Sequence, residues 1–236
     1  MKRVTVSLLV FNEKHNLEDT IAKAYNELEK LNFKYELWIF DNCSTDGTDK
    51  LLESLLKKYK YLKYFRQKKN FGYSVNFQTA LKVPDADYKF VIDGDGQYDL
   101  ANIKDCIKIL DTGYDIVVGI RKLRKDSKIR ILMSFVLKYL SKTILKSNLE
   151  DINVGYRCMT KECADKINLK CKYNFANPEM FALSVILKLK IAEKIVNHYP
   201  RKGGQGEFSS FKNSILNSLL MIKHIFDLRN EIKKSK

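Results

Sequence analysis

Two aspartates separated by one glycine, in the pentapeptide 93–97 (DGDGQ), are the side chains in this sequence best suited to hold a metal ion. They follow Phe90–Ile92, an apolar run typical of a buried strand. Residues two apart in an extended segment point to the same side, so Asp93 and Asp95 can converge on one ion and Gln97 can add a third oxygen. Mg²⁺ and Mn²⁺ prefer oxygen ligands, and Mg²⁺ commonly shares its shell with substrate phosphates. The pentapeptide therefore predicts Mg²⁺ or Mn²⁺ on a diphosphate, although taken alone it also fits a plain polar turn.

The elements that must position these carboxylates alternate between strand and helix through the first half of the chain. The predicted strands are Val4–Val10, Glu36–Phe40, Tyr61–Phe65, Phe90–Ile92 and Asp115–Val118. The predicted helices are Leu17–Leu31, Thr48–Tyr59, Tyr73–Leu81 and Asn102–Leu110. This alternation favours right-handed β-α-β units, and hence an α/β fold with a mostly parallel central sheet flanked by helices on both faces.

Polar side chains stand at three of the predicted strand ends. Asn12 and Glu13 follow the first strand, Asp41 follows the second and Asp93 follows the fourth. The carboxyl ends of parallel strands form one rim, where the ligands of open α/β sheets bind. A carboxylate such as Asp41 is costly at the end of an apolar strand unless it is paired or solvated, which favours a functional role. There is no G-x-G-x-x-G after the first strand and no Walker P-loop, so Rossmann dehydrogenases and P-loop NTPases are disfavoured.

The composition is that of a folded, strongly basic protein. Hydrophobic residues make up 45% and aromatic residues 11% of the 236 positions, which argues against disorder. The formal net charge of +15 favours anionic partners such as nucleotides, lipid phosphates or an anionic membrane surface. Nucleic acid is also an anionic partner that this charge would attract. No nucleic-acid-binding motif is visible, so we expect no nucleic-acid partner.

Cysteine usage and hydropathy bear on the compartment. Five cysteines without a C-x-x-C pair indicate a reducing compartment. Residues 1–3 run directly into the first predicted strand, so no secretory signal peptide is predicted. The apolar segments are shorter than the roughly 20 residues that a membrane span needs. We therefore expect a cytoplasmic protein whose membrane contact, if it has one, is peripheral.

Five short motifs resemble, in the same order, those of family 2 glycosyltransferases, and most closely those of the dolichol-phosphate mannose synthases and related polyprenyl-phosphate glycosyltransferases. The motifs are residues 9–13 (LVFNE), 41–48 (DNCSTDGT), 70–72 (NFG), 93–97 (DGDGQ) and 155–157 (GYR). The resemblance implies a GT-A, Rossmann-like catalytic domain at 1–210. Residues 211–236 would form a C-terminal amphipathic helix with a basic tail.

The resemblance also implies roles for particular residues. The enzyme would bind a nucleotide-diphosphate sugar and transfer the sugar with inversion, with the metal on Asp93, Asp95 and Gln97. The residues implied around the nucleotide are Phe11, Glu13, Asp41, Asn42, Asn70, Gly72 and Asp93. Asp95 would also act in catalysis, because a metal on the diphosphate stabilises the charge that grows on the leaving phosphate.

Several positions depart from the family pattern. Leu9 replaces the usual proline, Phe11 the usual tyrosine and Cys43 the usual glycine, while Asn42 replaces an acidic residue. An amide both donates and accepts where a carboxylate only accepts, so Asn42 can change the base preference. The base of the nucleotide is therefore left open.

The acceptor is predicted from the most cationic stretch, residues 121–130, which holds six basic residues and one acidic residue for a net charge of +5. Arginine forks suit phosphate oxygens, which favours a phosphate clamp, although a solvated loop also fits. In the relatives, an arginine after the fifth strand and an Arg-x-x-x-Ser pattern lie at the acceptor phosphate, and Arg121, Arg130 and Ser134 match these features. The helix expected to follow fits a membrane surface or packing on the core.

A sugar hydroxyl as acceptor would need a general base, whereas an ionised phosphate would not. Asp151 and Glu179 are the candidate bases, and they join Asp95 and Arg121 as candidate catalytic residues. Glu179 also fits a plain first-turn position of a helix. Residues 198–206 resemble a mobile family loop, which implies a lid with Arg201 on the diphosphate, although a plain surface loop also fits.

Three functions remain open at this point. The first is transfer of a sugar from a nucleotide-diphosphate sugar to a polyprenyl phosphate, at the cytoplasmic face of the membrane. The second is the same donor chemistry on a saccharide hydroxyl, in cell-surface polysaccharide or glycolipid assembly. The third, a non-catalytic basic binding module, is permitted by the charge alone. Residues 211–236 fit a membrane contact, packing on the domain or a dimer contact equally well.

Overall fold

A computed structural model provides the fold. It describes residues 1–121, 139, 149–151, 154–170, 175–203, 220, 223, 224, 226–228 and 230. Two predicted acceptor-site residues, Arg130 and Ser134, lie outside these residues, as does most of the predicted segment 211–236.

The described elements begin with a regular alternation of strand and helix and then depart from it. In chain order they are β1 (Arg3–Val10), α1 (Lys14–Glu29), β2 (Lys34–Asp41), α2 (Thr48–Lys58), β3 (Leu62–Arg66), α3 (Tyr73–Lys82), β4 (Tyr88–Asp93), α4 (Ile103–Asp111), β5 (Ile116–Arg121), β6 (Tyr156–Thr160), α6 (Lys161–Lys166), α7 (Ala176–Ile186) and β7 (Ile191–Val196). The predicted α/β class is confirmed.

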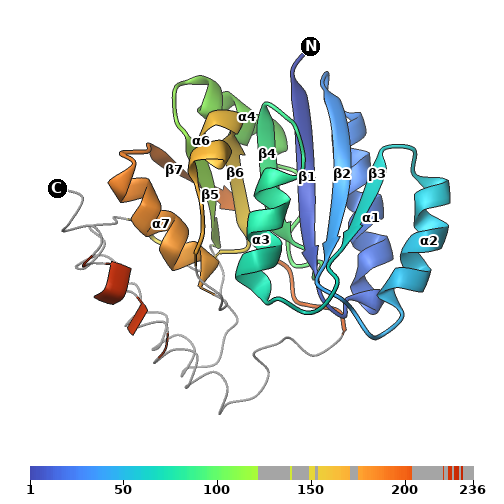
Figure 1. The fold of residues 1–236 in the computed structure, drawn as a ribbon. Helices are drawn as coiled ribbons and strands as arrows, with labels where there is room; N and C mark the ends of the chain where they lie inside the picture. Colours follow the sequence, from blue (N-terminus) through green and yellow to red (C-terminus); the bar gives the residue numbers. More distant parts are fainter. Residues whose placement is uncertain are drawn as a thin grey trace.

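The strands form one sheet with the order β3-β2-β1-β4-β6-β5-β7 (Figure 1). β1, β2, β3 and β4 pair in parallel, and so do β5 and β7. β6 runs antiparallel to both of its neighbours, β4 and β5. The sheet is therefore mostly parallel, and it brings the carboxyl ends of β1, β2 and β4 to one rim.

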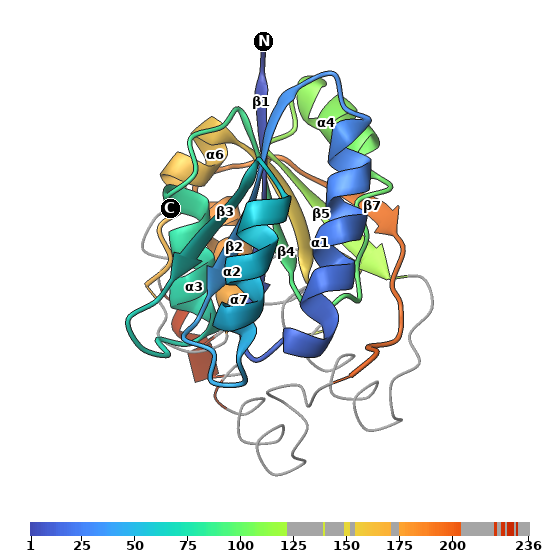
Figure 2. The same cartoon turned by 90° about the vertical axis from the view of Figure 1, so that its right-hand side faces the viewer.

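Helices cover both faces of the sheet (Figures 1 and 2). α1 and α4 lie on one face, and α3, α6 and α7 lie on the other. α2 packs on α1 and on the edge strand β3. The buried residues of α1 include Leu17, Ile21, Ala24 and Leu28, whose spacing of three or four residues turns one apolar stripe toward the sheet.

The five strands and four helices predicted for the first half of the chain are all present, with ends shifted by up to three residues. β6, α6 and β7 were not predicted, and of α7 only a first-turn position at Glu179 was considered. β6 is five residues long and carries the charged, buried Arg157 at its second position, so it has no apolar run. Eight of the eleven residues of α7 are buried, which removes the one-sided pattern that identifies a surface helix.

Among the described residues, no helix is both long and apolar enough to cross a membrane.

Candidate active site

Asp93 ends β4 and is held from several directions. Its backbone N–H donates to the Gly155 carbonyl at 2.9 Å, and its Oδ1 accepts the Tyr73 hydroxyl at 2.7 Å. The Arg157 guanidinium lies 3.7 Å from the same Oδ1. Gly155 leaves the room that this arrangement needs, because a Cβ there would stand 2.1 Å from Asp93 Oδ2. The side chain of Asp93 keeps 33% of its surface exposed, at the rim.

The turn after β4 directs Asp95 to the same rim. Gly94 donates its N–H to the Leu9 carbonyl at 2.8 Å, and a Cβ at Gly94 would meet Val10 Cγ2 at 2.7 Å. Asp95 Oδ1 accepts the Gln97 N–H at 3.1 Å, which closes the turn. Burial, with the nearby charge of Asp93, raises the pKa of Asp95 to about 6. A bound cation would favour the charged form of Asp95, against the effect of burial and of the neighbouring carboxylate.

Glu13, the residue before α1, adds a third carboxylate at this rim. Its side chain is 8% exposed, its Oε2 accepts the Asn16 amide at 2.8 Å and its Oε1 pairs with Arg201 at 2.5 Å. Burial raises the pKa of Glu13 to about 7, with a further contribution from the charge of Asp95. The bonds from Asn16 and Arg201 act in the opposite direction, but burial outweighs them.

The segment 201–203 lies across the first turns of α1. Arg201 Nε and Asn16 Nδ2 both donate to the Gly203 carbonyl, at 2.9 and 3.1 Å. Lys202 pairs with Asp19 at 2.9 Å. Arg201 is thus brought to the predicted rim, where its partner is Glu13. A contact of Arg201 with a diphosphate stays a prediction.

Gln97 is tied to the chain that leads into this segment. Its side-chain Nε2 donates to the Tyr199 carbonyl at 3.1 Å, and its backbone carbonyl accepts the Tyr199 N–H at 2.8 Å. The neighbouring Tyr98 and His198 form a β-bridge. The amide nitrogen of Gln97 is therefore engaged away from the aspartates, and its role as a metal ligand stays a prediction.

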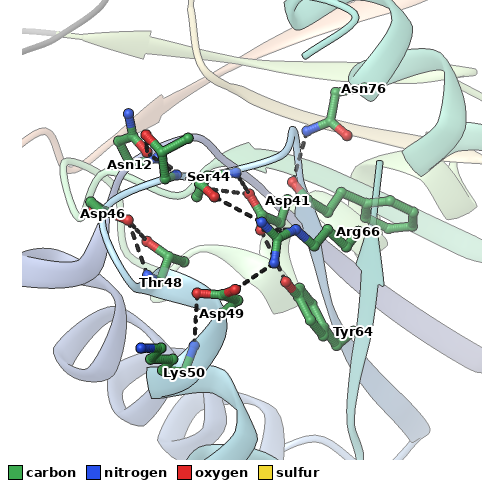
Figure 3. Close-up of polar contacts among 12 residues, drawn as sticks. Asn12, Asp41, Ser44, Asp46, Thr48, Asp49, Lys50, Tyr64, Arg66 and Asn76 are labelled. Atoms are coloured by element: carbon green, nitrogen blue, oxygen red, sulfur yellow. Dashed lines mark hydrogen bonds and ion pairs between the residues drawn. The ribbon is translucent and has the colours of Figure 1, made fainter. Parts of the chain in front are cut away.

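Asp41, the last residue of β2, is fully buried and well bonded (Figure 3). Its Oδ1 accepts the Ser44 N–H at 2.8 Å and the Ser44 hydroxyl at 2.5 Å, and its Oδ2 accepts the Tyr64 hydroxyl at 2.9 Å. Arg66 Nε lies 3.8 Å from Oδ2. The cost of burying this carboxylate is thus offset inside the protein, and a nucleotide contact stays a prediction.

Asn42 links the end of β2 to the loop before α3. Its amide donates to Asn70 Oδ1 at 2.7 Å, and its Oδ1 accepts the Phe71 N–H at 3.0 Å. Asn70 Oδ1 also accepts the Gly72 N–H at 2.9 Å, and Gly72 has a φ of 87° that favours glycine. Asn42 therefore joins the end of β2 to the motif at 70–72 through both atoms of its amide. Phe11 lies half-buried at the end of β1.

Asp46 joins the starts of two helices (Figure 3). Its Oδ1 accepts the Thr48 N–H at 3.0 Å at the start of α2. Its Oδ2 accepts the Lys14 N–H, also at 3.0 Å, at the start of α1. The motif 41–48 therefore has a structural function as a helix start, which its serine, threonine and aspartate residues indicate.

Two predicted acceptor-side residues are paired with each other. Arg121 Nε and Nη2 donate to the two carboxylate oxygens of Asp151 at 2.7 and 3.1 Å. Glu179 lies in the first turn of α7, 3% exposed, and accepts the Lys170 N–H at 2.7 Å. The first-turn position of Glu179 is thus observed. That Asp151 or Glu179 acts as a base stays a prediction. That Arg121 binds a phosphate also stays a prediction.

Two residues at this rim, Tyr73 and Asn16, were given no site role from the sequence. Tyr73 binds Asp93, and Asn16 binds Glu13. Tyr73 follows the Gly72 of one motif, whereas nothing in the local pattern marks Asn16. The motif 155–157 resembles the family's Gly-aromatic-Arg element, which implies a place for Arg157 in the active-site framework, and Arg157 lies beside Asp93.

The donor set at the rim fits a divalent cation that shares its shell with a substrate. Among the described residues, no group of three or more histidine, cysteine or acidic side chains forms a metal cage. Asp93 and Asp95 supply two carboxylates, which matches the way Mg²⁺ is held by one or two carboxylates plus phosphates.

A match to a known protein family identifies the family of this chain. Residues 5–162, more than half of the chain, match glycosyl transferase family 2. The chain belongs to this family. The family predicted from the five motifs is therefore confirmed, and with it an enzyme of the nucleotide-sugar glycosyltransferase class.

Two relatives in sequence are also described as glycosyltransferases. This family 2 glycosyltransferase is 24% identical over 231 residues to "Putative glycosyltransferase CsbB" of Bacillus subtilis (strain 168), covering 95% of this chain and 68% of that protein. It is 28% identical over 200 residues to the poly(ribitol-phosphate) beta-N-acetylglucosaminyltransferase TarP of Staphylococcus aureus (strain N315), covering 80% of this chain and 59% of that protein. The chain thus spans only part of the length of each relative.

The fold is shared with a solved enzyme. Glucosyl-3-phosphoglycerate synthase from Mycobacterium tuberculosis, in complex with Mn²⁺, UDP-glucose and phosphoglyceric acid, superposes with a TM-score of 0.74 at 14% identity. The match covers 97% of this family 2 chain and 80% of that one. At this identity the likeness shows the fold alone, and the predicted GT-A fold is confirmed.

Proposed function

We propose that this chain is an inverting, metal-dependent glycosyltransferase that moves a sugar from a nucleotide-diphosphate sugar to a polyprenyl phosphate. One observation carries the donor half of the proposal. Asp93 and Asp95 stand at the end of β4, on the rim that also holds Glu13 and its partner Arg201. Carboxylates for a cation beside an arginine fork are the groups that a diphosphate needs.

Different residues would bind the metal and the phosphates of the donor. Asp95, with Asp93, would hold Mg²⁺ or Mn²⁺, and the solved enzyme of the same fold was captured with Mn²⁺ and UDP-glucose. When bound, the cation supplies positive charge where the leaving diphosphate becomes more negative. Arg201 already lies at the rim through Glu13, so it can exchange that partner for a phosphate when the segment 201–203 moves.

The acceptor half is supported by charge. Residues 121–130 carry a net charge of +5 within a chain of net charge +15, which suits an anionic lipid phosphate at a membrane surface. An ionised phosphate oxygen attacks without a general base. The site of action would then be the cytoplasmic face of the membrane, with the protein attached peripherally.

A second candidate is transfer to a hydroxyl of a cell-surface polymer. The bidentate pair of Arg121 with Asp151 favours it, because the guanidinium predicted for the acceptor phosphate already has a carboxylate partner. The printed name of TarP describes transfer to a poly(ribitol-phosphate). In this case Glu179, or Asp151 once it is released from Arg121, would take the hydroxyl proton.

The experiment is nucleotide release by the purified chain from UDP-, GDP- and CDP-sugars, with Mg²⁺ or Mn²⁺, with and without a short polyprenyl phosphate. We expect metal-dependent release that the lipid phosphate stimulates and that Asp95→Asn lowers by about a hundredfold or more. Glu53→Gln, which changes an exposed carboxylate of α2 outside the site, is the matched control and should leave release unchanged.

The other outcomes separate the candidates. Release that ignores the lipid but responds to a polyol-phosphate polymer would replace the first candidate by the second. Release that survives Asp95→Asn would exclude the proposed metal site. If no donor releases its nucleotide, this chain is not an active transferase when it acts alone.

A further inference from the structure

Arg157 is a charged side chain in the middle of the sheet. It lies on β6 with 1% of its surface exposed, and neither its Nε nor its Nη1 has a hydrogen-bond partner among the described residues. A buried guanidinium with unbonded N–H groups is costly to the fold. An apolar residue of similar size would cost less, so packing alone does not account for an arginine here.

The surroundings of Arg157 point to one side of the site. Its guanidinium carbon lies 5.8 Å from the centre of the Tyr73 ring and 5.0 Å from the centre of the Phe77 ring, both on α3. Its Nη1 lies 3.7 Å from Asp93 Oδ1. Aromatic rings beside a guanidinium restrict its orientation, because the planar group can stack on them as well as attract them.

Tyr73 connects the arginine to the carboxylate. Its hydroxyl donates to the same Asp93 Oδ1 at 2.7 Å while its ring lies against Arg157. Asp93 is thus held through its oxygen by α3 and β6, and through its backbone by Gly155. Carboxylate ligands of metals are typically oriented by such outer partners.

We propose that Arg157 is a positioning residue that acts through Tyr73 and Asp93. It fixes the tyrosine ring and supplies a permanent positive charge behind the carboxylate, so that Asp93 is already aimed at the rim before a cation and a diphosphate arrive. The metal half of this inference rests on the proposed function. The coupling between Arg157 and Asp93 does not.

The chain offers a matched control for the buried charge. Lys89 is also a buried cation of this sheet, 2% exposed, on β4. Its Nζ donates to the Leu81 carbonyl at 2.8 Å and lies 3.8 Å from Asp165, at the other end of the strand from Asp93. Arg157 and Lys89 therefore share burial and charge but differ in the acid that they face.

The first test is a double-mutant cycle of thermal unfolding in EDTA, which needs no ligand. Asp93→Asn should lower the melting temperature by roughly 4 °C or more, because it leaves the buried Arg157 charge without its carboxylate. In the Arg157→Met background the same change should cost less than half as much. In the Lys89→Met background the full cost should remain. Equal cost in all three backgrounds would overturn the coupling.

The second test measures Mn²⁺ alone by electron paramagnetic resonance, and it covers the case in which Arg157→Met does not fold. Tyr73→Phe keeps the ring but removes the hydroxyl, and Arg157→Lys keeps the charge but removes the planar fork. Each should weaken Mn²⁺ binding about tenfold or more. Tyr88→Phe is the matched control, since Tyr88 bonds Asp111 at the opposite end of β4.

The outcomes are distinguishable from failure of the proposed function. Unchanged Mn²⁺ binding in Tyr73→Phe and Arg157→Lys would mean that these contacts serve only the stability of the fold. That result would overturn the positioning role. Tighter binding would mean that the contacts compete with the cation, which also overturns it. If the unsubstituted chain binds no Mn²⁺, the proposed metal site fails, and the unfolding cycle alone decides whether Arg157 and Asp93 are coupled.

Discussion

Glu13 shows how one side chain links the chemistry of the rim to the stability of the fold. Its carboxylate is buried, it pairs with Arg201 and it feels the charge of Asp95. The result is a pKa near 7, well above the usual value of 4.5. A group whose pKa is higher in the folded state binds more protons there than in the unfolded chain, so stability falls as the pH rises between the two values.

We therefore predict that, without metal, the free energy of unfolding falls between about pH 4.5 and pH 7. Glu13 should contribute on the order of 1–3 kcal/mol of this fall. Glu13→Gln should make the fall in this window smaller, because the amide does not titrate, and the part that remains belongs to other groups such as Asp95. Urea denaturation at several pH values is the measurement.

Glu53→Gln, which changes an exposed carboxylate of α2, should keep the profile of the unsubstituted protein. A profile for Glu13→Gln that overlays this control would show that Glu13 titrates at its ordinary pKa.

At the residue scale, the sequence allowed the acids of the rim to be predicted better than their partners. Asp93 and Asp95 could be found because they follow an apolar run at a fixed spacing. Arg157 lies 64 positions beyond Asp93 in the sequence, and it contacts Asp93 only because β6 pairs with β4. A contact that depends on strand order leaves no local pattern in the sequence.

At the scale of elements, Asp46 joins α1 and α2 by a single side chain. One oxygen accepts the amide at the start of α2, and the other accepts the amide of Lys14 at the start of α1. The helix start at Thr48 could be predicted, because aspartate near a helix start is favoured. The bond to Lys14 could not, because that residue lies 32 positions away.

We predict that Asp46→Ala lowers the free energy of unfolding by about 1–3 kcal/mol, since it leaves amides at two helix starts without acceptors. The measurement is equilibrium denaturation in urea. Glu53→Ala on the exposed face of α2 serves as the control and should change the value by less than about 0.5 kcal/mol. If both variants lose the same small amount, the shared bond contributes nothing measurable.

At the scale of the whole molecule, Arg121 and Asp151 hold the end of β5 against the chain that leads to β6. Their side chains are 15% and 5% exposed, and the guanidinium bonds both carboxylate oxygens. Loss of Arg121 would leave Asp151 without this partner, and the reverse also holds. Activity losses in the single variants therefore do not separate a phosphate clamp from a general base.

We predict that Arg121→Ala and Asp151→Ala each lower the free energy of unfolding by about 3 kcal/mol, as expected when one partner of a mostly buried pair is removed. The double variant should lose no more than the worse of the two single variants, because both halves of the pair are gone. Urea denaturation of the four proteins is the measurement. Additive losses would show that the pair is energetically uncoupled.

The first half of the fold could be predicted because each strand and helix there has its own regular pattern. β6 could not, because a buried arginine interrupts its pattern, and burial on most sides obscures all of α7 beyond its first turn. Arg157 and Glu179, whose roles at the site are predictions, lie on these two elements.

The position of β6 in the sheet has a consequence for the nascent chain. β4 and β5 are separated in the sheet by β6, although β6 follows both in the sequence. A ribosome that has released only the chain before Tyr156 therefore presents β5 without the strand that joins it to β4. Gly155 and Arg157, which hold Asp93, emerge with that strand. Folding during synthesis would complete the strand pairs of β1, β2 and β3 first, and the acidic rim would acquire its final shape only as one of the last long-range pairings forms.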